Sequence, residues 1–594
     1  MIRQLIKTFS PGENALMVVI ASFIGLAAGL GNILFRSVEQ LVHHVIFQNG
    51  YELLIGTGGL RLLFLPLLPM FGMVLLIPLS YLFPGEVNGY GFTSFLRKVN
   101  LQGGKIRART IFLKTIATSL TIGTGGSAGV EGPIAQVGGA IGSQVGQFFR
   151  VSGERMKVYI AAGCAGGIAA MFNAPIAGVF FASEIVLLGT YEISSFSALV
   201  ISSAMATVVS RAVYGETPAF PVPDYQLVNA PLEIPLYMLM GIVVGVVAVL
   251  HIRIFYRVRD AFAALQMNMY VKPVLGAFIV GVIGIFTPQV MGNGYEYIGD
   301  VLQGNGVVRI MLLLVFLKMI ATAVTLGSGG AGGVFAPSLF IGGVLGGAFG
   351  GIANFLLPAG TIASSGAYAA VGIGSFLGAV THAPLTAIFL LFEMTGNYLI
   401  IIPIMLTSII GTVVSTKLNR DSIDTVDFTR DGIDIHDGRE TAVMRSIKVG
   451  KAMSEDVGFI SESANVNHLL RIFSMAEDSF YFPVLADSGS NAGQMVGIIS
   501  LQDVKAILHD DELRENASVG TICARDVITL TPEDDLFTAM TLFTVKGIEA
   551  IPVVENQQAR WVVGMLKRRD VIAAYNREVL KRGISGKTAA IPLT

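Results

Sequence analysis

The chain has 594 residues, of which 53% are hydrophobic and only 14% are charged, and its mean hydropathy is +0.68. Soluble domains carry about 25% charged residues, so this composition excludes an entirely water-soluble protein and indicates that lipid solvates much of the chain. The net charge of −1 gives no reason to expect a nucleic-acid partner.

Long apolar windows predict membrane-spanning helices in the first 420 residues. A hydrocarbon core of about 30 Å needs roughly 20 apolar residues in a straight helix. The basic residues Arg3 and Lys7 favour a cytoplasmic N-terminus. We therefore expect residues 1–420 to form a membrane domain. Its predicted spans are 15–35, 60–83, 236–254, 273–287, 310–326 and 400–418.

The membrane region contains an internal duplication. FLKTIATSLTIGTGGSAGVEGP at 112–133 matches FLKMIATAVTLGSGGAGGVFAP at 316–337, at a constant offset of 316 − 112 = 204 residues. Repeats of apolar segments interrupted by glycine are typical of transporters whose site lies between the repeats, on the ends of broken helices. We place the two repeats at about 60–210 and 270–418.

A shorter pair of motifs extends the match. NAP at 173–175 corresponds to HAP at 382–384, and each is followed nine residues later by an acid, Glu184 or Glu393. Either acid has a plain structural interpretation, in which it caps or pairs near a helix end.

The duplicated glycine-rich motifs predict an anion site. Glycines allow backbone N–H groups to converge on one point, and helix N-termini carry partial positive charge, so the two motifs together bind an anion without a full positive charge. Where the second copy has Phe335, the first has Glu131. A carboxylate at this place competes with the anion and leaves when protonated, which predicts a gate and proton carrier. The alternative for the glycines is close helix packing.

The composition changes near residue 420, where acids become frequent and the spans stop. The remainder is itself doubled, since VGKAMSEDV is repeated as VGTICARDV seventy residues later. Alternating strand and helix patterns predict β-α-β-β-α units. We assign a linker at 421–446 and a soluble part at 447–594 that resembles a pair of CBS domains, at about 449–508 and 519–578.

Three motifs in order carry a second resemblance. NGYGF at 88–92, GVEGP at 129–133 and GGVFAP at 332–337 are similar to the anion-pathway motifs of CLC chloride channels and proton-coupled chloride antiporters. The resemblance covers roughly 15–430. It implies an all-α polytopic membrane domain of two inverted-topology repeats, followed by an α/β cytoplasmic CBS pair.

The resemblance also implies partners and location. A CLC-type protein is a homodimer in lipid with one anion pathway per subunit; here we expect a prokaryotic plasma membrane and two cytoplasmic termini. It is no enzyme, requires no cofactor and holds no metal. Glu131 matches the gate glutamate of the family. The anion-binding residues that the resemblance implies are Tyr90, Gly129, Val130, Gly132, Val334 and Phe335.

Several positions depart from the family pattern. Tyr90 replaces a serine that binds the central anion, and Val130 replaces an arginine. Asp424 stands at the place of an anion-binding tyrosine. Ile185 stands at the place of an inner proton-relay glutamate. Asp424 is smaller than the tyrosine that it replaces. We expect the Tyr90 ring to fill the volume that is left there, and the Tyr90 phenol to donate a hydrogen bond to the central anion. Asp424 cannot lie ionised against an anion, so it faces the cytoplasm, pairs with a cation, or is protonated and serves as the inner relay. The alternative is an ordinary solvated linker aspartate.

The CBS pair predicts a nucleotide site. Such pairs often bind adenosine nucleotides through a hydroxyl and an acid at a strand-to-helix turn, which here are Ser500 and Asp503 in the first copy. The second copy has Lys567 and Asp570. The alternative is a pair that only stiffens the dimer.

These features favour proton-linked exchange of chloride or another small monovalent anion, such as bicarbonate or nitrate. An uncoupled, voltage- or pH-gated chloride channel remains the alternative, because channels usually lack the glutamate missing at Ile185. A CBS-regulated cation transporter is remote, since the spans offer no clustered carboxylates. A membrane-anchored sensor without transport is equally remote.

Overall fold

The computed structural model describes residues 13–581 apart from 55, 57–58, 152, 190–192, 217–219, 221, 224, 226, 434–438, 476–479, 489–491, 506–516 and 557–559. The chain divides into two compact units, one ending at Asp427 and the other beginning at Phe428. The first is helical and the second is α/β, which confirms the predicted fold class. The membrane unit extends seven residues beyond its expected end at 420, because the segment after the last long helix packs back onto it.

Within the described residues, seven helical stretches are long and apolar enough to cross a membrane. Five contain predicted spans. The predicted span at 273–287 forms a shorter helix of 15 residues. The stretches Phe196–Tyr214 and Phe335–Leu356 were not predicted as spans, because small residues lower their mean hydropathy to 1.6 and 1.7, whereas the other five reach 2.2 or more.

The helices of the two repeats correspond in order. Among the α-helices that the structure describes, α2 (Glu13–Val42) and α3 (Asn49–Leu54) come first, seven belong to the first repeat and seven to the second, and the long α11 (Ala230–Ala264) lies between the repeats in the chain. The first set is α4 (Leu67–Leu82), α5 (Phe92–Leu101), α6 (Arg109–Gly123), α7 (Glu131–Phe148), α8 (Gly153–Phe172), α9 (Pro175–Phe181) and α10 (Ile193–Tyr214). The second is α12 (Lys272–Phe286), α13 (Tyr295–Leu302), α14 (Val308–Ser328), α15 (Phe335–Leu356), α16 (Ser365–Thr381), α17 (Pro384–Thr395) and α18 (Ile401–Leu418).

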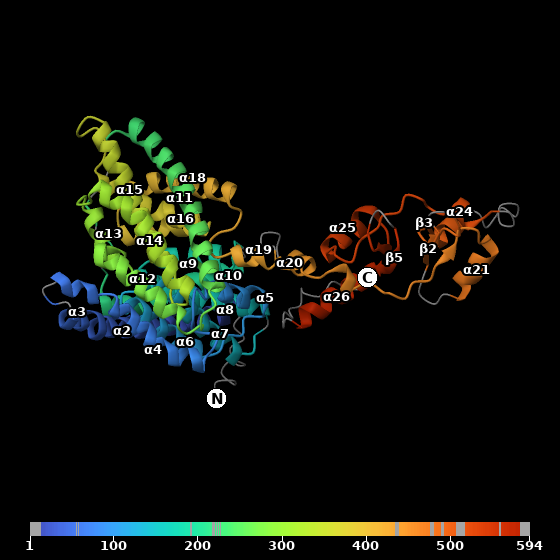
Figure 1. Ribbon diagram of the computed structural model, residues 1–594, viewed down its shortest axis with the longest axis horizontal. Helices are drawn as coiled ribbons and strands as arrows, with labels where there is room; N and C mark the ends of the chain where they lie inside the picture. The colour runs from blue at the N-terminus through green and yellow to red at the C-terminus, as the bar shows by residue number, and fades with distance from the viewer. Residues whose placement is uncertain are drawn as a thin grey trace. The chain divides into compact units, whose positions relative to one another are not determined.

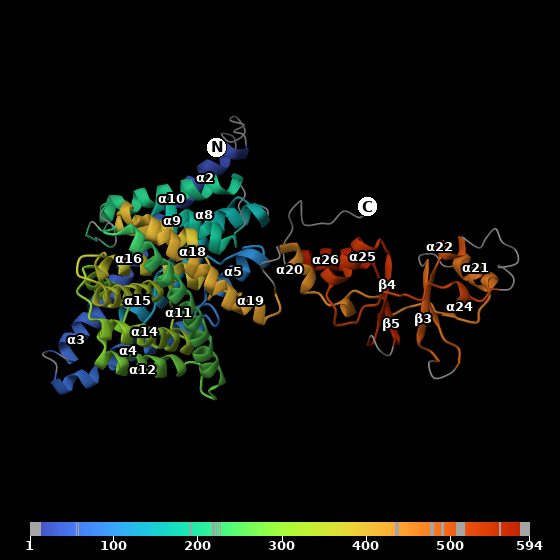
Figure 2. The same cartoon turned by 90° about the horizontal axis from the view of Figure 1, so that it is seen from above.

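Glycines allow equivalent helices of the two repeats to pack at backbone contact. A Cβ on Gly138 of α7 would lie 2.1 Å from the carbonyl oxygen of Gly163 in α8, and one on Gly342 of α15 would lie 2.4 Å from that of Gly372 in α16. Gly138 and Gly342 are again 204 residues apart. The repeats also meet each other where α4 packs on α12 and α9 on α17. Figure 1 labels α7, α8, α15 and α16, and Figure 2 shows α8, α15 and α16 from a view turned by 90°.

The C-terminal unit contains two similar modules. The helices α19 (Val426–Arg430) and α20 (Arg439–Arg445) precede them. The first module has β1 (Ile460–Ser461), α21 (Val466–Met475), β2 (Tyr481–Leu485), β3 (Met495–Ser500) and α22 (Leu501–Lys505). The second has α24 (Val519–Ile522), α25 (Leu536–Lys546), β4 (Ala550–Val554), β5 (Val562–Lys567) and α26 (Arg568–Lys581).

In each module the two longer strands pair antiparallel, β2 with β3 and β4 with β5. The segment that leads into each module also pairs with a strand of the other module. Ser454, at the start of the first, pairs with Met565 in β5, while Ala524, at the start of the second, pairs with Ile498 in β3. This pairing holds the two modules together.

Candidate functional site

The two glycine-rich motifs lie directly against each other. Gly129 and Gly333 form an isolated antiparallel bridge, in which each amide donates to the carbonyl oxygen of the other at 2.7 Å. The helices α7 and α15 both begin two residues after their bridged glycine. Because the bridge is antiparallel and reciprocal, the two helix N-termini start from one point, as inverted repeats require.

Glu131 occupies the space between these N-termini. Its side chain is fully buried, and Oε2 accepts a hydrogen bond from the backbone amide of Ala336 at 3.1 Å. Oε1 accepts a hydrogen bond from the Tyr295 hydroxyl. Ala336 is the second residue of α15, so the carboxylate caps a helix of the other repeat and lies where a free anion would bind.

Gly129 provides the room for this arrangement. A Cβ at this position would lie 2.2 Å from Oε2 of Glu131 and 2.9 Å from the amide nitrogen of Ala336. Any side chain at residue 129 would therefore displace the carboxylate from the helix end.

The structure brings the predicted backbone ligands together. Val130, Gly132, Val334 and Phe335 are buried at the starts of α7 and α15. The amide that reaches the Glu131 carboxylate is nevertheless that of Ala336, which sequence reasoning missed by one residue. The signal was present, because the second residue of a helix is where a capping oxygen finds its donor.

Asp424 is buried, so the interpretation of this residue as an ordinary solvated linker aspartate is wrong. Its exposed fraction is 1%, and the Tyr90 hydroxyl donates to its Oδ1. The Tyr90 phenol is thus engaged by Asp424 instead of being free for an anion. The two departures from the family pattern are in direct contact, 334 residues apart in the chain.

The segment around Asp424 is tied to the membrane unit by three contacts. The amide of Ile423 donates to the carbonyl oxygen of Val380 at 3.0 Å, and the Tyr256 hydroxyl donates to the carbonyl oxygen of Ile423 at 2.8 Å. Arg259 forms a bidentate ion pair with Asp427, with its shorter contact at 2.6 Å. Burial of Asp424 follows from these contacts.

Burial also changes the protonation of the pair. Asp424 follows the last candidate span, and burial raises the pKa of its carboxyl from 3.8 to about 6, while the hydrogen bond from Tyr90 acts in the opposite direction. Burial raises the pKa of Tyr90 as well, so the phenol stays protonated as a donor. Within the described part of the chain, Oδ2 of Asp424 has no hydrogen-bond partner, so the alternative in which this carboxylate pairs with a cation is not observed.

A row of aromatic rings connects Tyr90 with the start of α15. The ring centroids of Tyr90 and Phe92 are 6.4 Å apart, those of Phe92 and Phe181 are 6.1 Å apart, and those of Phe181 and Phe335 are 5.4 Å apart. Ala336 follows Phe335 and holds Glu131. The two buried carboxylates therefore lie at opposite ends of one row of side chains.

Glu184 and Glu393 are reciprocal helix caps, as the structural interpretation predicts. The Glu184 carboxylate accepts hydrogen bonds from the backbone amides of Leu385 and Thr386 at the start of α17. Glu393 accepts from those of Ile176 and Ala177 at the start of α9, at 3.0 and 2.8 Å. Each repeat thus caps a helix of the other.

The predicted nucleotide residues lie at equivalent strand-to-helix turns. Between β3 and α22, the amide and hydroxyl of Ser500 donate to Oδ2 of Asp503 at 2.7 and 2.6 Å. Between β5 and α26, the amide of Lys567 donates to Oδ2 of Asp570 at 3.3 Å. In both turns one carboxylate oxygen is therefore used internally.

Comparisons with known proteins agree with this architecture. The family model described as voltage gated chloride channel matches residues 71–416, and the CBS domain model matches 449–510 and 519–577. A putative chloride channel protein ClcB-like of Ralstonia nicotianae is 32% identical over 419 residues, which are 68% of this chain and 95% of that protein. An H(+)/Cl(−) exchange transporter ClcA of Vibrio campbellii is 32% identical over 430 residues, 71% of this chain and 91% of its own. The crystal structure of a slow cyanobacterial Cl−/H+ antiporter aligns with a TM-score of 0.63 at 27% identity, covering 70% of this chain and 97% of that one.

Proposed function

The chain belongs to the voltage gated chloride channel family, and we propose that it exchanges chloride, or another small monovalent anion, for protons across a membrane. The similarity to proteins named as H(+)/Cl(−) exchange transporters and to a Cl−/H+ antiporter supports the coupled mechanism over a passive channel.

One observation carries the proposal: Glu131 lies buried as a tethered anion on the N-terminus of α15. While ionised it competes with a free anion for the same N–H groups. Protonation removes its charge, so the side chain leaves and an anion takes its place. The same residue thus gates the anion and accepts the proton.

The anion would be held by peptide groups at the starts of the two helices. We assign this role to the amides of Val130, Gly132, Val334, Phe335 and Ala336; the amide of Gly129, expected from the sequence to take part, already donates to the carbonyl oxygen of Gly333. Peptide dipoles stabilise an anion less than a full positive charge does, and a weaker site releases the ion quickly enough for transport.

We assign the inner proton site to Asp424, with Tyr90 as its donor. Burial and the unpartnered Oδ2 make this carboxyl ready to accept a proton, which the apolar side chain at Ile185 cannot do. Coupled exchange does not then require a glutamate at 185.

The decisive experiment is anion flux from liposomes that contain the purified protein. Under a fixed chloride gradient, an added pH gradient should move the reversal potential away from the Nernst potential of chloride. A reversal potential that stays at this value would identify an uncoupled channel, and absence of anion flux would reject the proposal.

The CBS pair would bind an adenosine nucleotide through Ser500 and Asp503, with Lys567 meeting the phosphates. Calorimetry on the full-length protein should then show heat with ATP, ADP or AMP, and Asp503→Ala should weaken binding about tenfold or more through loss of a charged hydrogen bond. Glu455→Ala, in the same module, serves as a control. No heat with any of the three nucleotides would favour a purely structural pair.

Assembly and placement complete the proposal. We expect a homodimer in lipid with one pathway per subunit, in a prokaryotic plasma membrane with both termini in the cytoplasm. The mass of the protein–detergent particle checks the dimer, and protease access to the CBS pair in sealed vesicles checks the orientation.

A further inference from the structure

An Asn-Gly-Tyr sequence stands near the start of a helix in each repeat, at 88–90 and 293–295. The spacing is 293 − 88 = 205 residues, one more than the offset of the glycine-rich motifs. Both glycines have left-handed backbones, with φ of 71° at Gly89 and 84° at Gly294, and the turns lead into α5 and α13. Tyr90 lies two residues before the first residue of α5, whereas Tyr295 is the first residue of α13, so the two tyrosines occupy neighbouring but not equivalent positions in the two repeats.

Each of these tyrosines donates its hydroxyl to a buried carboxylate. Tyr90 donates to Asp424, and Tyr295 donates to Glu131. In both cases the acid lies outside the repeat that supplies the tyrosine: Tyr295 of the second repeat reaches the first, and Tyr90 of the first reaches the segment after the second. The structure thus contains two similar tyrosine–carboxylate pairs.

A buried lysine accompanies each turn. The Lys318 ammonium donates to the carbonyl oxygens of Val290 and Gly292, at 2.9 and 3.0 Å, just before the second turn. Lys114 precedes it by 204 residues, and its nitrogen lies 2.6 Å from where a Cβ on Gly91 would be. A buried lysine beside the glycine that precedes the helix is therefore present in both repeats.

We propose that Tyr295 is the latch of the Glu131 gate: its hydroxyl holds the ionised carboxylate on the N-terminus of α15, as Tyr90 holds Asp424 at the other end of the aromatic row. This inference rests on the proposed function of Glu131. Hydrogen bonds to an ionised acceptor are about twice as strong as those to a neutral one. Protonation of Glu131 therefore weakens its hydrogen bond with Tyr295 and also removes the charge that holds the carboxylate on the N-terminus of α15.

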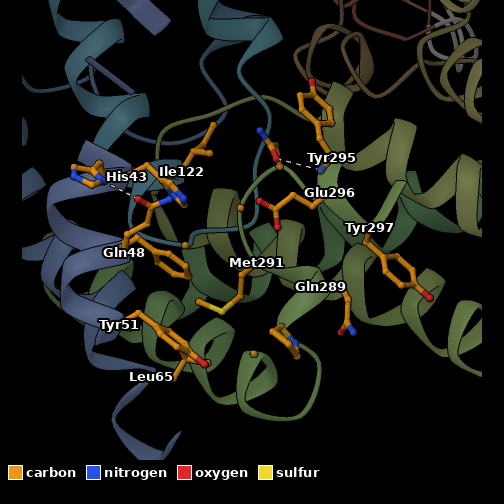
Figure 3. Close-up of a pocket in the computed structure, with 18 of the residues that line it drawn as sticks. His43, Gln48, Tyr51, Leu65, Ile122, Gln289, Met291, Tyr295, Glu296 and Tyr297 are labelled. Carbon is orange, nitrogen blue, oxygen red and sulfur yellow. Dashed lines mark hydrogen bonds between the residues drawn. The ribbon is translucent and has the colours of Figure 1, made fainter. Parts of the chain in front are cut away.

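The position of Tyr295 suits this role. Its ring packs edge-on against Phe220, with centroids 5.3 Å apart. Tyr295 is among the residues that line a cavity of about 900 Å³, and Figure 3 shows its ring pointing away from cavity residues such as Tyr51 and Met291. The hydroxyl is therefore directed into the protein.

The charged surroundings of this pair are few. Arg36 and Glu39 on α2 act on the Tyr295 phenol, and the Lys318 ammonium lies 3.3 Å from where a Cβ on Gly294 would be. Glu296 and Asp300 lie on α13 itself, whereas α15 and α16, which pack against it, carry no charged side chain. These groups are unchanged in a Tyr295 variant, so a change in the pH dependence of its anion flux reports on the protonation of Glu131.

The test is the pH dependence of anion flux from liposomes that contain the Tyr295→Phe protein. Loss of one hydrogen bond to an ionised carboxylate should move half-maximal activation by about one pH unit toward higher pH. A fluorinated tyrosine at 295, whose phenol is the stronger donor, should move it toward lower pH. If the pH of half-maximal activation moves in opposite directions in the two variants, a simple packing defect is excluded. The fluorinated protein keeps the test decisive if the phenylalanine variant fails to fold.

Two controls separate this inference from the proposed function. Tyr297→Phe removes a hydroxyl from the same turn of α13 and should leave the profile in place. In a Glu131→Gln background, Tyr295→Phe should have no further effect. If Glu131→Gln abolishes pH dependence while the profiles of both 295 variants coincide with the wild type, the latch is wrong and the gate stands; if Glu131→Gln keeps the wild-type profile, the gate itself is wrong.

Discussion

Glu131→Gln is expected to give anion flux that no longer depends on pH and no longer moves protons. The amide is neutral at every pH, so it cannot act as a tethered anion on the N-terminus of α15. At a pH above the activation midpoint of the wild type, the open population should rise about tenfold for each pH unit of distance from that midpoint. Under combined chloride and pH gradients, the reversal potential should return to the Nernst potential of chloride.

Glu393→Gln is the matched control for this variant. Glu393 also caps a helix of the other repeat, but the hydrogen bonds described for its carboxylate come from two backbone amides at the start of α9. We expect it to lower stability by about 1 kcal/mol, as loss of a cap does, and to keep the pH dependence of transport. A folded Glu131→Gln protein whose reversal potential still follows the pH gradient would contradict the assignment of the gate.

Asp424→Asn is expected to uncouple proton from anion movement while anion flux persists. The asparagine can still accept the Tyr90 hydroxyl, so the contact survives, but it cannot bind a proton near pH 6. Proton flux measured alongside chloride flux should fall relative to the wild type.

The same variant makes a prediction about stability. Because the folded-state pKa of Asp424 lies above its ordinary value, the native protein holds the proton more tightly than the unfolded chain does. The contribution of Asp424 to stability is therefore complete below pH 4 and is lost as the pH rises through 6. The difference between a pKa of about 6 in the folded protein and the ordinary value of 3.8 corresponds to about 3 kcal/mol in the free energy of unfolding. In Asp424→Asn this loss is absent, so Tm should decline less between pH 4 and pH 7 than in the wild type.

Asp421→Asn, a change at a partly exposed aspartate of the same segment, is the control for both measurements. It should keep the wild-type coupling and the wild-type decline of Tm. Unchanged coupling in a folded Asp424→Asn protein would show that the inner proton site lies elsewhere.

The sequence by itself determined the duplicated membrane domain, the two glycine-rich motifs with Glu131 in the first of them, and the CBS pair. These features are local: apolar runs, glycines before a helix start and a repeated motif are each readable within a few dozen residues. Two spanning helices escaped prediction because they are rich in small residues, which lowers hydropathy although such residues favour close helix packing.

Only the tertiary structure decided which groups hold the two buried carboxylates. Tyr295 lies 164 residues from Glu131, and Tyr90 lies 334 residues from Asp424, so no local pattern joins them. Asp424 looks like one of several linker acids in the sequence; its burial depends on contacts from Val380, Tyr256 and Arg259, which act on neighbouring residues of the segment. Burial and pairing are properties of the whole fold, and they convert an ordinary aspartate into a group that titrates near pH 6.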